Sequence, residues 1–398
     1  MPEMPLAPRR RPLWRLFFMP VLLLIAAAAW SAFWFYSASR VDVTADAWRA
    51  REAQSGRVYD CARRSVAGYP FRLEVRCDGA SVSLVSQTAG EPAGGAPITA
   101  RLGEILVVAQ VYDPKLLIAE FTAPATISDR DGQPSMVANW RTARSSVVGL
   151  PAVPRRIALV FDDPSIDRIA GSMQTPVARA RHVELHARLA EGVPSDHPVI
   201  ETALQLEGGS VQGVHPLLAQ PFDANVLTRL SGLRDLTPKP WPQRFREIQA
   251  AGGHVDIVQS RIQQGDVIAT AAGTLSLGND GRLEGELQMT VVGIEKVVAA
   301  LGIEKMLEEG VPQATLDRVA PGLKTQDLNN LFGALDRAIP GLGTAVKQNA
   351  NAGVAAGLNA IGKEAVLEGK KARSFPLRFT DGAVSLGPLK VAEIPPLF

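Results

Sequence analysis

An uncharged stretch at residues 16–36 limits how this chain can fold more than any other feature of the sequence. As a helix, its 21 residues reach roughly 30 Å, enough to cross the hydrocarbon core of a bilayer. Four arginines precede the stretch, and Arg40 stands alone just after it. Because positively charged segments resist translocation, we predict a basic cytoplasmic tail at 1–15, a transmembrane anchor at 16–36 and the remaining chain on the far side.

A cleavable signal peptide is the alternative interpretation of this stretch. Residues 37–39 (Ser-Ala-Ser) are small enough to form a cleavage site, but the apolar part exceeds the usual length of about 7–15 residues. Trp30, Trp34 and Tyr36 lie near its end, as aromatic side chains do at a membrane–water interface. We therefore expect an anchor that is not cleaved.

Two cysteines, Cys61 and Cys77, follow the anchor with 15 residues between them. In an oxidising compartment, two cysteines in neighbouring elements normally pair. We therefore predict a disulfide between them, which stabilises the fold by about 3 kcal/mol because it restricts the unfolded chain. Two buried free thiols are the alternative, and they are more typical of a cytosolic protein.

The distribution of charge excludes one class of partner. Residues 1–36 carry +3, and the rest of the chain carries −1, with 38 basic and 39 acidic residues. The sequence contains no basic stripe that could follow a phosphate backbone. We therefore expect the membrane as a partner and no nucleic acid.

Short runs of alternating apolar and polar residues recur beyond the anchor. Residues 71–77 alternate without a break, which predicts a strand with Cys77 on its core-facing side. The pairs Asp113-Pro114 and Asp280-Gly281 predict hairpin turns. The predicted fold class is α+β: a large, mostly antiparallel β-sheet with a few packing helices, preceded by one transmembrane helix.

Helices are expected in several segments, among them residues 241–251, which end at Gly252-Gly253. Residues 43–54 predict a short helix after the anchor, apolar residues within 294–340 recur near a spacing of 3.6, and residues 345–366 are rich in alanine. Three closely spaced prolines indicate a boundary between two regions. The predicted regions are 37–236, rich in sheet, and 237–398, with strands and helices.

One cluster has the residue types of a metal site. His182, Glu184 and His186 share one face of a predicted strand. Consecutive positions on a strand are spaced along it and do not converge on one point. We therefore expect solvated side chains and neither a metal nor a cofactor.

Two further motifs have the residue types of catalytic sites. Residues 357–363 have phosphate-loop spacing, but Glu364 stands where Ser or Thr must bind magnesium. Residues 195–197 (Ser-Asp-His) are sequence neighbours, whereas triad members come from distant segments. We expect no catalytic residues and no enzyme.

Several short motifs occur in an order that resembles one family. They are Gly-Tyr-Pro-Phe-Arg at 68–72, Val-Tyr-Asp-Pro at 111–114, Gln-Ala-Ala-Gly-Gly at 249–253, Gly-Thr-Leu-Ser-Leu at 273–277, Gly-Arg-Leu-Glu-Gly at 281–285 and Leu-Gly-Pro at 386–388. This order is similar to that of the domain-of-unknown-function 2125 family of Gram-negative bacteria. The resemblance implies a bacterial envelope protein and brings no activity or site residues. The hairpin style is also similar, more loosely, to large anchored periplasmic proteins of lipid traffic and outer-membrane assembly.

Three functions are open at this point. The first is a non-enzymatic inner-membrane protein with its N-terminus in the cytoplasm and its bulk in the periplasm, whose sheet binds lipid or another amphiphile in envelope maintenance. It predicts a continuous apolar groove. The second is an interaction module or scaffold of a membrane complex, which predicts a filled core. The third is an envelope hydrolase, which predicts a pocket with converging carboxylates.

Overall fold

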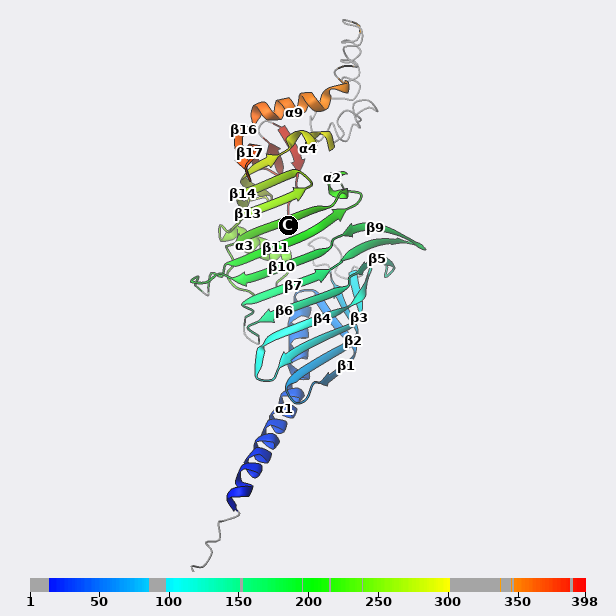
Figure 1. The fold of residues 1–398 in the computed structure, drawn as a ribbon, viewed down its shortest axis with the longest axis vertical. Helices are drawn as coiled ribbons and strands as arrows, with labels where there is room; N and C mark the ends of the chain where they lie inside the picture. The colour runs from blue at the N-terminus through cyan, green and yellow to red at the C-terminus, as the bar shows by residue number, and fades with distance from the viewer. Residues whose placement is uncertain are drawn as a thin grey trace, which may run out of the picture.

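A single long helix, α1 (Trp14–Gln54), enters the fold from the N-terminal side (Figure 1). The computed structural model describes residues 14–85, 98–150, 153–194, 196–214, 216–237, 239–300, 337, 345, 347–386 and 389–398. The sequence predicts two helices in the α1 region, at 16–36 and 43–54. The structure joins them, because residues 37–42 contain neither glycine nor proline and the helix continues through them.

The upper half of α1 packs along the edge strand β1 (Arg57–Ala67). Ala38, Val41 and Ala45 are half-buried at helical spacing, so this side of the helix faces the sheet. Arg64 of β1 reaches back to the helix, with its Nε 2.8 Å from Asp42 Oδ1. The lower half of α1 is apolar and exposed, and it is long and apolar enough to cross a membrane.

The described residues form one antiparallel sheet of 19 strands. Beyond β1 the strands are β2 (Arg72–Leu84), β3 (Ile98–Gln110), β4 (Asp113–Ser128), β5 (Pro134–Asn139), β6 (Thr142–Val148), β7 (Arg156–Asp162), β8 (Ser165–Ala170), β9 (Met173–Arg179), β10 (His182–Leu189), β11 (Ile200–Val211), β12 (Phe222–Leu230), β13 (His254–Gln264), β14 (Val267–Leu277), β15 (Leu283–Val292), β16 (Lys363–Leu367), β17 (Lys370–Thr380), β18 (Ala383–Leu386) and β19 (Leu389–Glu393). The described helices beyond α1 are α2 (Pro216–Ala219), α3 (Trp241–Ala250), α4 (Ile294–Ala300) and α9 (Ala350–Ile361). The predicted fold class is confirmed.

Neighbouring strands in the sheet follow one main path away from α1. The path runs β1–β2–β3–β4–β6–β7–β10–β11–β12–β13–β14–β15–β17–β18–β19. Strands β5, β8 and β9 form a side arm between β4 and β11, and β16 pairs with β17. The predicted boundary falls between β12 and β13, which pair directly. The division into regions 37–236 and 237–398 stays a prediction.

Local details differ from the sequence predictions where pairing overrides propensity. The first predicted turn lies at residues 111–112, so Asp113 already begins β4. The alanine-rich helix ends at Ile361, and residues 363–367 form β16 because they pair with β17. Most of the predicted helical stripe at 294–340 lies outside the described residues, which include α4.

The best-buried core lies at the end of the sheet far from α1. Phe375 of β17 is fully buried there, and Val298 of α4 is 1% exposed. Around them pack Val291 of β15 and Ala355 and Leu358 of α9. Two helices therefore cover one face of the sheet at this end.

A disulfide joins Cys61 of β1 to Cys77 of β2, as the sequence predicts. The two Cα atoms are 5.6 Å apart, within the usual range for bonded cysteines. Both residues are half-buried on the hairpin that packs beside α1. The bond therefore closes the first hairpin of the sheet next to α1.

Candidate functional site

One face of the sheet is apolar from strand to strand, and we call it the apolar face. Directly paired residues of an antiparallel sheet share a face, so the register of the strands identifies its members. Three rows define it: a lower row of Leu73, Ala109, Leu117, Val147 and Ile157; a middle row of Leu159, Leu185, Leu204 and Val226; and an upper row of Phe161, Val183, Leu206, Ala224, Ile262, Ala269 and Val291.

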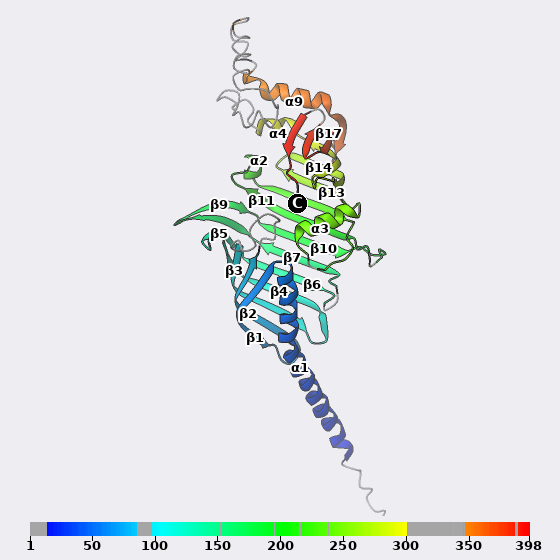
Figure 2. The same ribbon diagram turned by 180° about the vertical axis from the view of Figure 1, so that it is seen from behind.

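The apolar face connects the two ends of the molecule. Its lower row begins at Leu73, beside Arg72, whose carbonyl accepts a hydrogen bond from Trp34 of α1. Its upper row ends at Val291, in the core beneath α4 and α9. Figure 2 shows α1 lying in front of the first strands and the middle strands continuing above it. The face therefore runs from α1 to the far core.

The middle of this face is left partly open. Ile157 is 42% exposed, Leu185 38%, Leu204 36% and Ile262 44%. The ends differ, because helices pack on the sheet there and Val291 is 5% exposed. Large neighbouring apolar side chains in contact with water are unfavourable, and an extended patch of them marks an interaction or ligand site. The middle strands therefore present a candidate binding surface for an apolar group.

A small apolar cavity lies at one side of this surface. Its volume is about 200 Å³, and its walls include Val183 and Leu206 of the upper row together with Ile166, Ala178 and Phe222. These residues come from the main sheet and from the side arm of β8 and β9. The side arm therefore encloses one edge of the apolar face.

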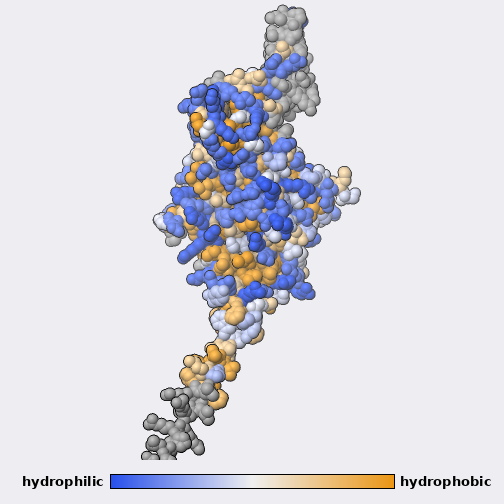
Figure 3. All heavy atoms as spheres, viewed as in Figure 1, coloured by the Kyte–Doolittle hydropathy of each residue, from blue (hydrophilic) through white to orange (hydrophobic). Residues whose placement is uncertain are grey.

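The opposite face of the same strands is charged. Arg156, Arg188, Glu201 and Arg229 are consecutive partners in one row. Glu201 bridges two of them, since its Oε2 lies 2.8 Å from Arg188 Nη2 and its Oε1 lies 2.7 Å from Arg229 Nη2. The hydrogen bond from Arg229, followed by the one from Arg188, lowers the pKa of Glu201. An open depression of about 950 Å³ lies over this row. From the viewpoint of Figure 1, the surface over the middle strands is mainly hydrophilic (Figure 3). The middle sheet is therefore amphipathic, with water-adapted groups on one side.

The cluster of two histidines and a carboxylate lies on this charged face. His182 Nδ1 is 2.8 Å from Asp162 Oδ1, and His182 Nε2 is 2.9 Å from Glu184 Oε1. Glu184 Oε2 is 3.0 Å from His186 Nε2. The side chains expected to be solvated are 24–35% exposed on this face, and they also bind one another along and across the strands. The described part of the chain contains no group of three or more such residues arranged to hold a metal ion.

These contacts shift the protonation of the cluster. Hydrogen bonds to Glu184 and then to Asp162 raise the pKa of His182 above its usual range. Hydrogen bonds from His186 and His182 lower the pKa of Glu184, and those from Thr142 and His182 lower the pKa of Asp162. Opposite charges near each group favour its charged form. The cluster is therefore a small hydrogen-bonded network whose carboxylates favour the protonated form of His182.

We expect this network to make stability depend on pH. A histidine whose pKa is raised in the folded state contributes its full stabilisation of the fold at pH values below its unfolded-state pKa of about 6.5. This contribution is lost as the pH rises through the pKa of the folded state. Between about pH 6 and pH 8, the thermal midpoint of the native chain should fall relative to that of His182→Gln, by about 2 °C or less because the pair is partly exposed. Asp162→Asn should weaken the pH dependence of the thermal midpoint. Parallel plots of thermal midpoint against pH for the native chain and His182→Gln would contradict a stabilising role for the charged form of His182.

The other sequence motifs do not form catalytic arrangements in the described residues. Asp196 and His197 lie in a turn, with their side chains 3.3 Å apart, and Ser195 lies outside the described residues. The segment with phosphate-loop spacing is the end of α9 followed by β16, whereas a phosphate loop follows a strand and opens a helix.

A charged cluster beside α3 was not indicated by the sequence. Glu247 accepts hydrogen bonds from Lys239 Nζ at 2.6 Å and from Arg244 Nη1 at 2.8 Å, and its side chain is 9% exposed. Asp235 also accepts from Lys239. The i,i+3 spacing of Arg244 and Glu247 could have indicated their ion pair from the sequence. The contacts with Lys239 and Asp235 could not be inferred in this way, because these residues precede the helix and the fold of the segment brings them to it. The cluster fixes α3 against the segment that enters it.

Comparison with protein families gives a match over most of the chain. The family described as "Uncharacterized protein conserved in bacteria (DUF2125)" matches residues 34–395. The match begins within α1 and includes all strands of the described sheet. No match was found among curated proteins. The resemblance inferred from the ordered turn motifs is confirmed.

Proposed function

We propose, for a chain that belongs to the DUF2125 family of uncharacterised bacterial proteins, that its apolar face binds the acyl chains of lipid or another amphiphile. The chain would be held by α1 in the bacterial inner membrane, with its N-terminus in the cytoplasm and its sheet in the periplasm. Its role would be non-enzymatic and would serve envelope maintenance.

The observation that carries the proposal is the unbroken register of apolar residues across the middle strands. The surface remains partly exposed at Ile157, Leu185, Leu204 and Ile262. An acyl chain gains about 0.8 kcal/mol for each methylene that it removes from water, so a long apolar track favours such a ligand. The charged face on the other side of the strands supports a sheet that meets an apolar partner from one side only.

Site-specific photo-crosslinking of the full chain in its membrane tests this proposal. A photo-reactive residue replaces Leu204 on the apolar face, and in a second variant it replaces Leu227 on the charged face. The two positions are similarly exposed, at 36% and 40%, and they lie on adjacent strands. We expect lipid adducts at 204 and few at 227. Equal adducts at both positions would refute the assignment to one face, and protein adducts at 204 would favour the interaction module.

Leu185→Glu is expected to block the apolar track. With the photo-reactive residue at Val226 of the same row, lipid adducts should fall at least about tenfold, because a carboxylate placed against acyl chains costs more than 1.4 kcal/mol unless it is paired. Ile118→Glu is the matched control, since Ile118 is 39% exposed and lies on the charged face, whereas Leu185 is 38% exposed. Equal losses in both variants would show a general effect of added charge.

A further inference from the structure

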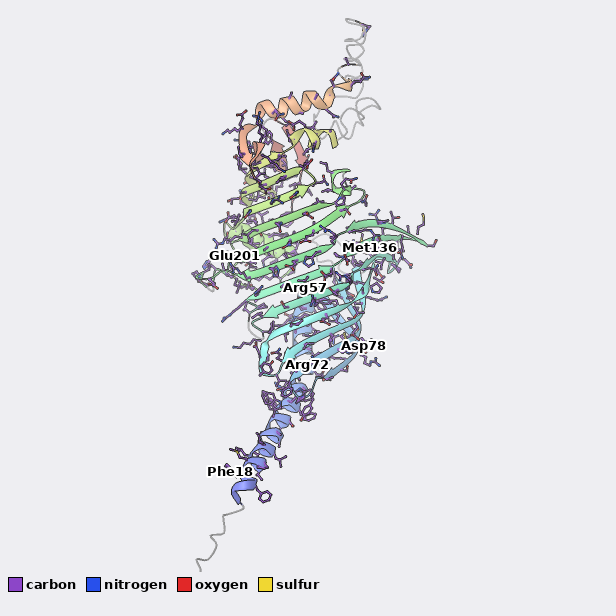
Figure 4. All side chains as sticks on the ribbon, in the orientation of Figure 1. Phe18, Arg57, Arg72, Asp78, Met136 and Glu201 are labelled. Carbon is purple, nitrogen blue, oxygen red and sulfur yellow. A yellow bond between two sulfur atoms is a disulfide. The ribbon has the colours of Figure 1, made fainter. Side chains whose placement is uncertain are left out.

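The base of the sheet is tied directly to α1 at two tryptophans. Trp30 Nε1 donates to Pro70 O at 2.8 Å, and Trp34 Nε1 donates to Arg72 O at 2.9 Å. Trp34 is 5% exposed, so this side of the helix is sealed against the β1–β2 turn. Figure 4 shows Arg72 at the base of the sheet and Phe18 much farther down the free part of α1. The helix therefore sets the height of the first turn along its own axis.

Two hairpin turns carry exposed aromatic side chains at this height. Tyr69 is 53% exposed and Phe71 63% in the β1–β2 turn, and Tyr112 is 67% exposed in the β3–β4 turn. The turns are joined, because Val111 N donates to Phe71 O at 3.1 Å. The Tyr69 hydroxyl is 2.8 Å from Ser31 Oγ of α1. We call Tyr69, Phe71 and Tyr112 the aromatic collar.

The β1–β2 turn contains a glycine with a positive φ at its start. Gly68 has a φ of +98°, and a Cβ there would lie 2.7 Å from Arg72 O. Only glycine fits such a close approach of two backbone segments. The turn therefore bends sharply and directs the following aromatic residues outward beside the helix.

The height of the collar matches the end of the apolar span. From Phe18 to Trp34 the helix rises about 24 Å, and the apolar part of a bilayer is about 30 Å thick. Phe33, Phe35 and Tyr36 of α1 are themselves exposed at the same level. Rings with polar tips favour the boundary between headgroups and acyl chains. An aqueous location would leave all of these rings in water.

We propose that the aromatic collar inserts into the outer headgroup region of the bilayer that α1 crosses. The partner is the lipid surface itself, which the collar meets on the side of the membrane that holds the sheet. The helix and two turns then make three contacts with one surface, so the sheet is held at a fixed orientation. The lower row of the apolar face, which starts at Leu73, would begin next to the membrane. This inference rests on the proposed crossing by α1 but not on lipid binding by the middle strands.

Depth measurements on the full chain in liposomes of phosphatidylethanolamine and phosphatidylglycerol test the collar. Nitroxide labels are placed through Phe71→Cys and Tyr112→Cys, while the native cysteines stay bonded to each other. Leu24→Cys in the span and Met173→Cys in the side arm, each 70% exposed, are the deep and aqueous references. Accessibility to oxygen is compared with accessibility to a water-soluble nickel complex.

We expect the oxygen-to-nickel ratio at 71 and 112 to lie between the two references and severalfold above that at 173. Tyr112 is the stricter probe, because it lies in the β3–β4 turn, which is hydrogen-bonded to the β1–β2 turn that α1 holds. A deep label at 24 with aqueous values at 71 and 112 would overturn the collar and leave the anchor intact. An aqueous label at 24 would overturn both the crossing and the collar, whereas lipid crosslinking at Leu204 reports separately on the apolar face.

Discussion

Phe375→Ala is expected to lower the free energy of unfolding by about 3–5 kcal/mol. The side chain is fully buried between the sheet and the helices α4 and α9, where it contacts the cluster of Val291, Val298 and Leu358. Removing the ring leaves a cavity that this packed end of the sheet can fill only in part. The urea midpoint of the full chain in detergent, followed by tryptophan fluorescence, measures the effect.

Val366→Ala on the adjacent strand β16 is the control for this substitution. Val366 is 75% exposed, so its truncation should change stability by no more than about 0.5 kcal/mol. An equally small effect at Phe375 would mean that the far core contributes little to the stability of the sheet. It would also mean that the packing of α4 and α9 over this end of the apolar face adds little stability.

Removal of the disulfide should have the second-largest effect. Replacing both Cys61 and Cys77 by serine releases a loop of 15 residues, and the unfolded chain gains conformational entropy equivalent to about 3 kcal/mol. We expect a lower urea midpoint for the double variant and for the native chain after reduction. A count of free thiols before and after reduction establishes the redox state of each sample.

The location of the bond makes a second readout available. The bonded hairpin carries the turn that Trp30 and Trp34 bind, so its loss should loosen the contact between the sheet and α1. Limited proteolysis within residues 55–85 should then become faster in the double variant than in the native chain. Identical proteolysis with unchanged stability would show that strand pairing alone holds this hairpin.

The strands were predictable where the local pattern is strong. Alternation at 71–77 and the Asp280-Gly281 pair lead to β2 and to the β14–β15 hairpin, because both signals lie within a few residues. Strand ends were harder, as the start of β4 at Asp113 shows. The conversion of residues 363–367 from expected helix to β16 depends on β17, which supplies the hydrogen bonds.

The candidate site was less predictable than the strands that form it. Leu185 and Leu204 are ordinary apolar residues within alternating runs, and nothing nearby in the sequence indicates that they are paired. Their alignment requires the β10–β11 register, and their exposure requires that no helix packs on them in the described fold. The sequence suggested an apolar groove only as one consequence of a lipid-binding hypothesis.

The sequence by itself determined the properties set by local composition. A charge-free run of 21 residues with arginines before it predicts a helix long enough to span a membrane, and two cysteines in neighbouring strands predict their bond. Ordered turn motifs were sufficient to indicate the family. Each of these signals lies within a short segment or depends on order alone.

Only the tertiary structure decided which side chains meet. The joining of anchor and second helix into α1, the rows of the apolar face and the aromatic collar all depend on pairings between distant segments. A shift of one residue in any strand would turn its apolar side chains to the charged face. Register is fixed by the packing of the whole sheet, and this is why the surfaces proposed to meet lipid emerge from the fold and not from the sequence.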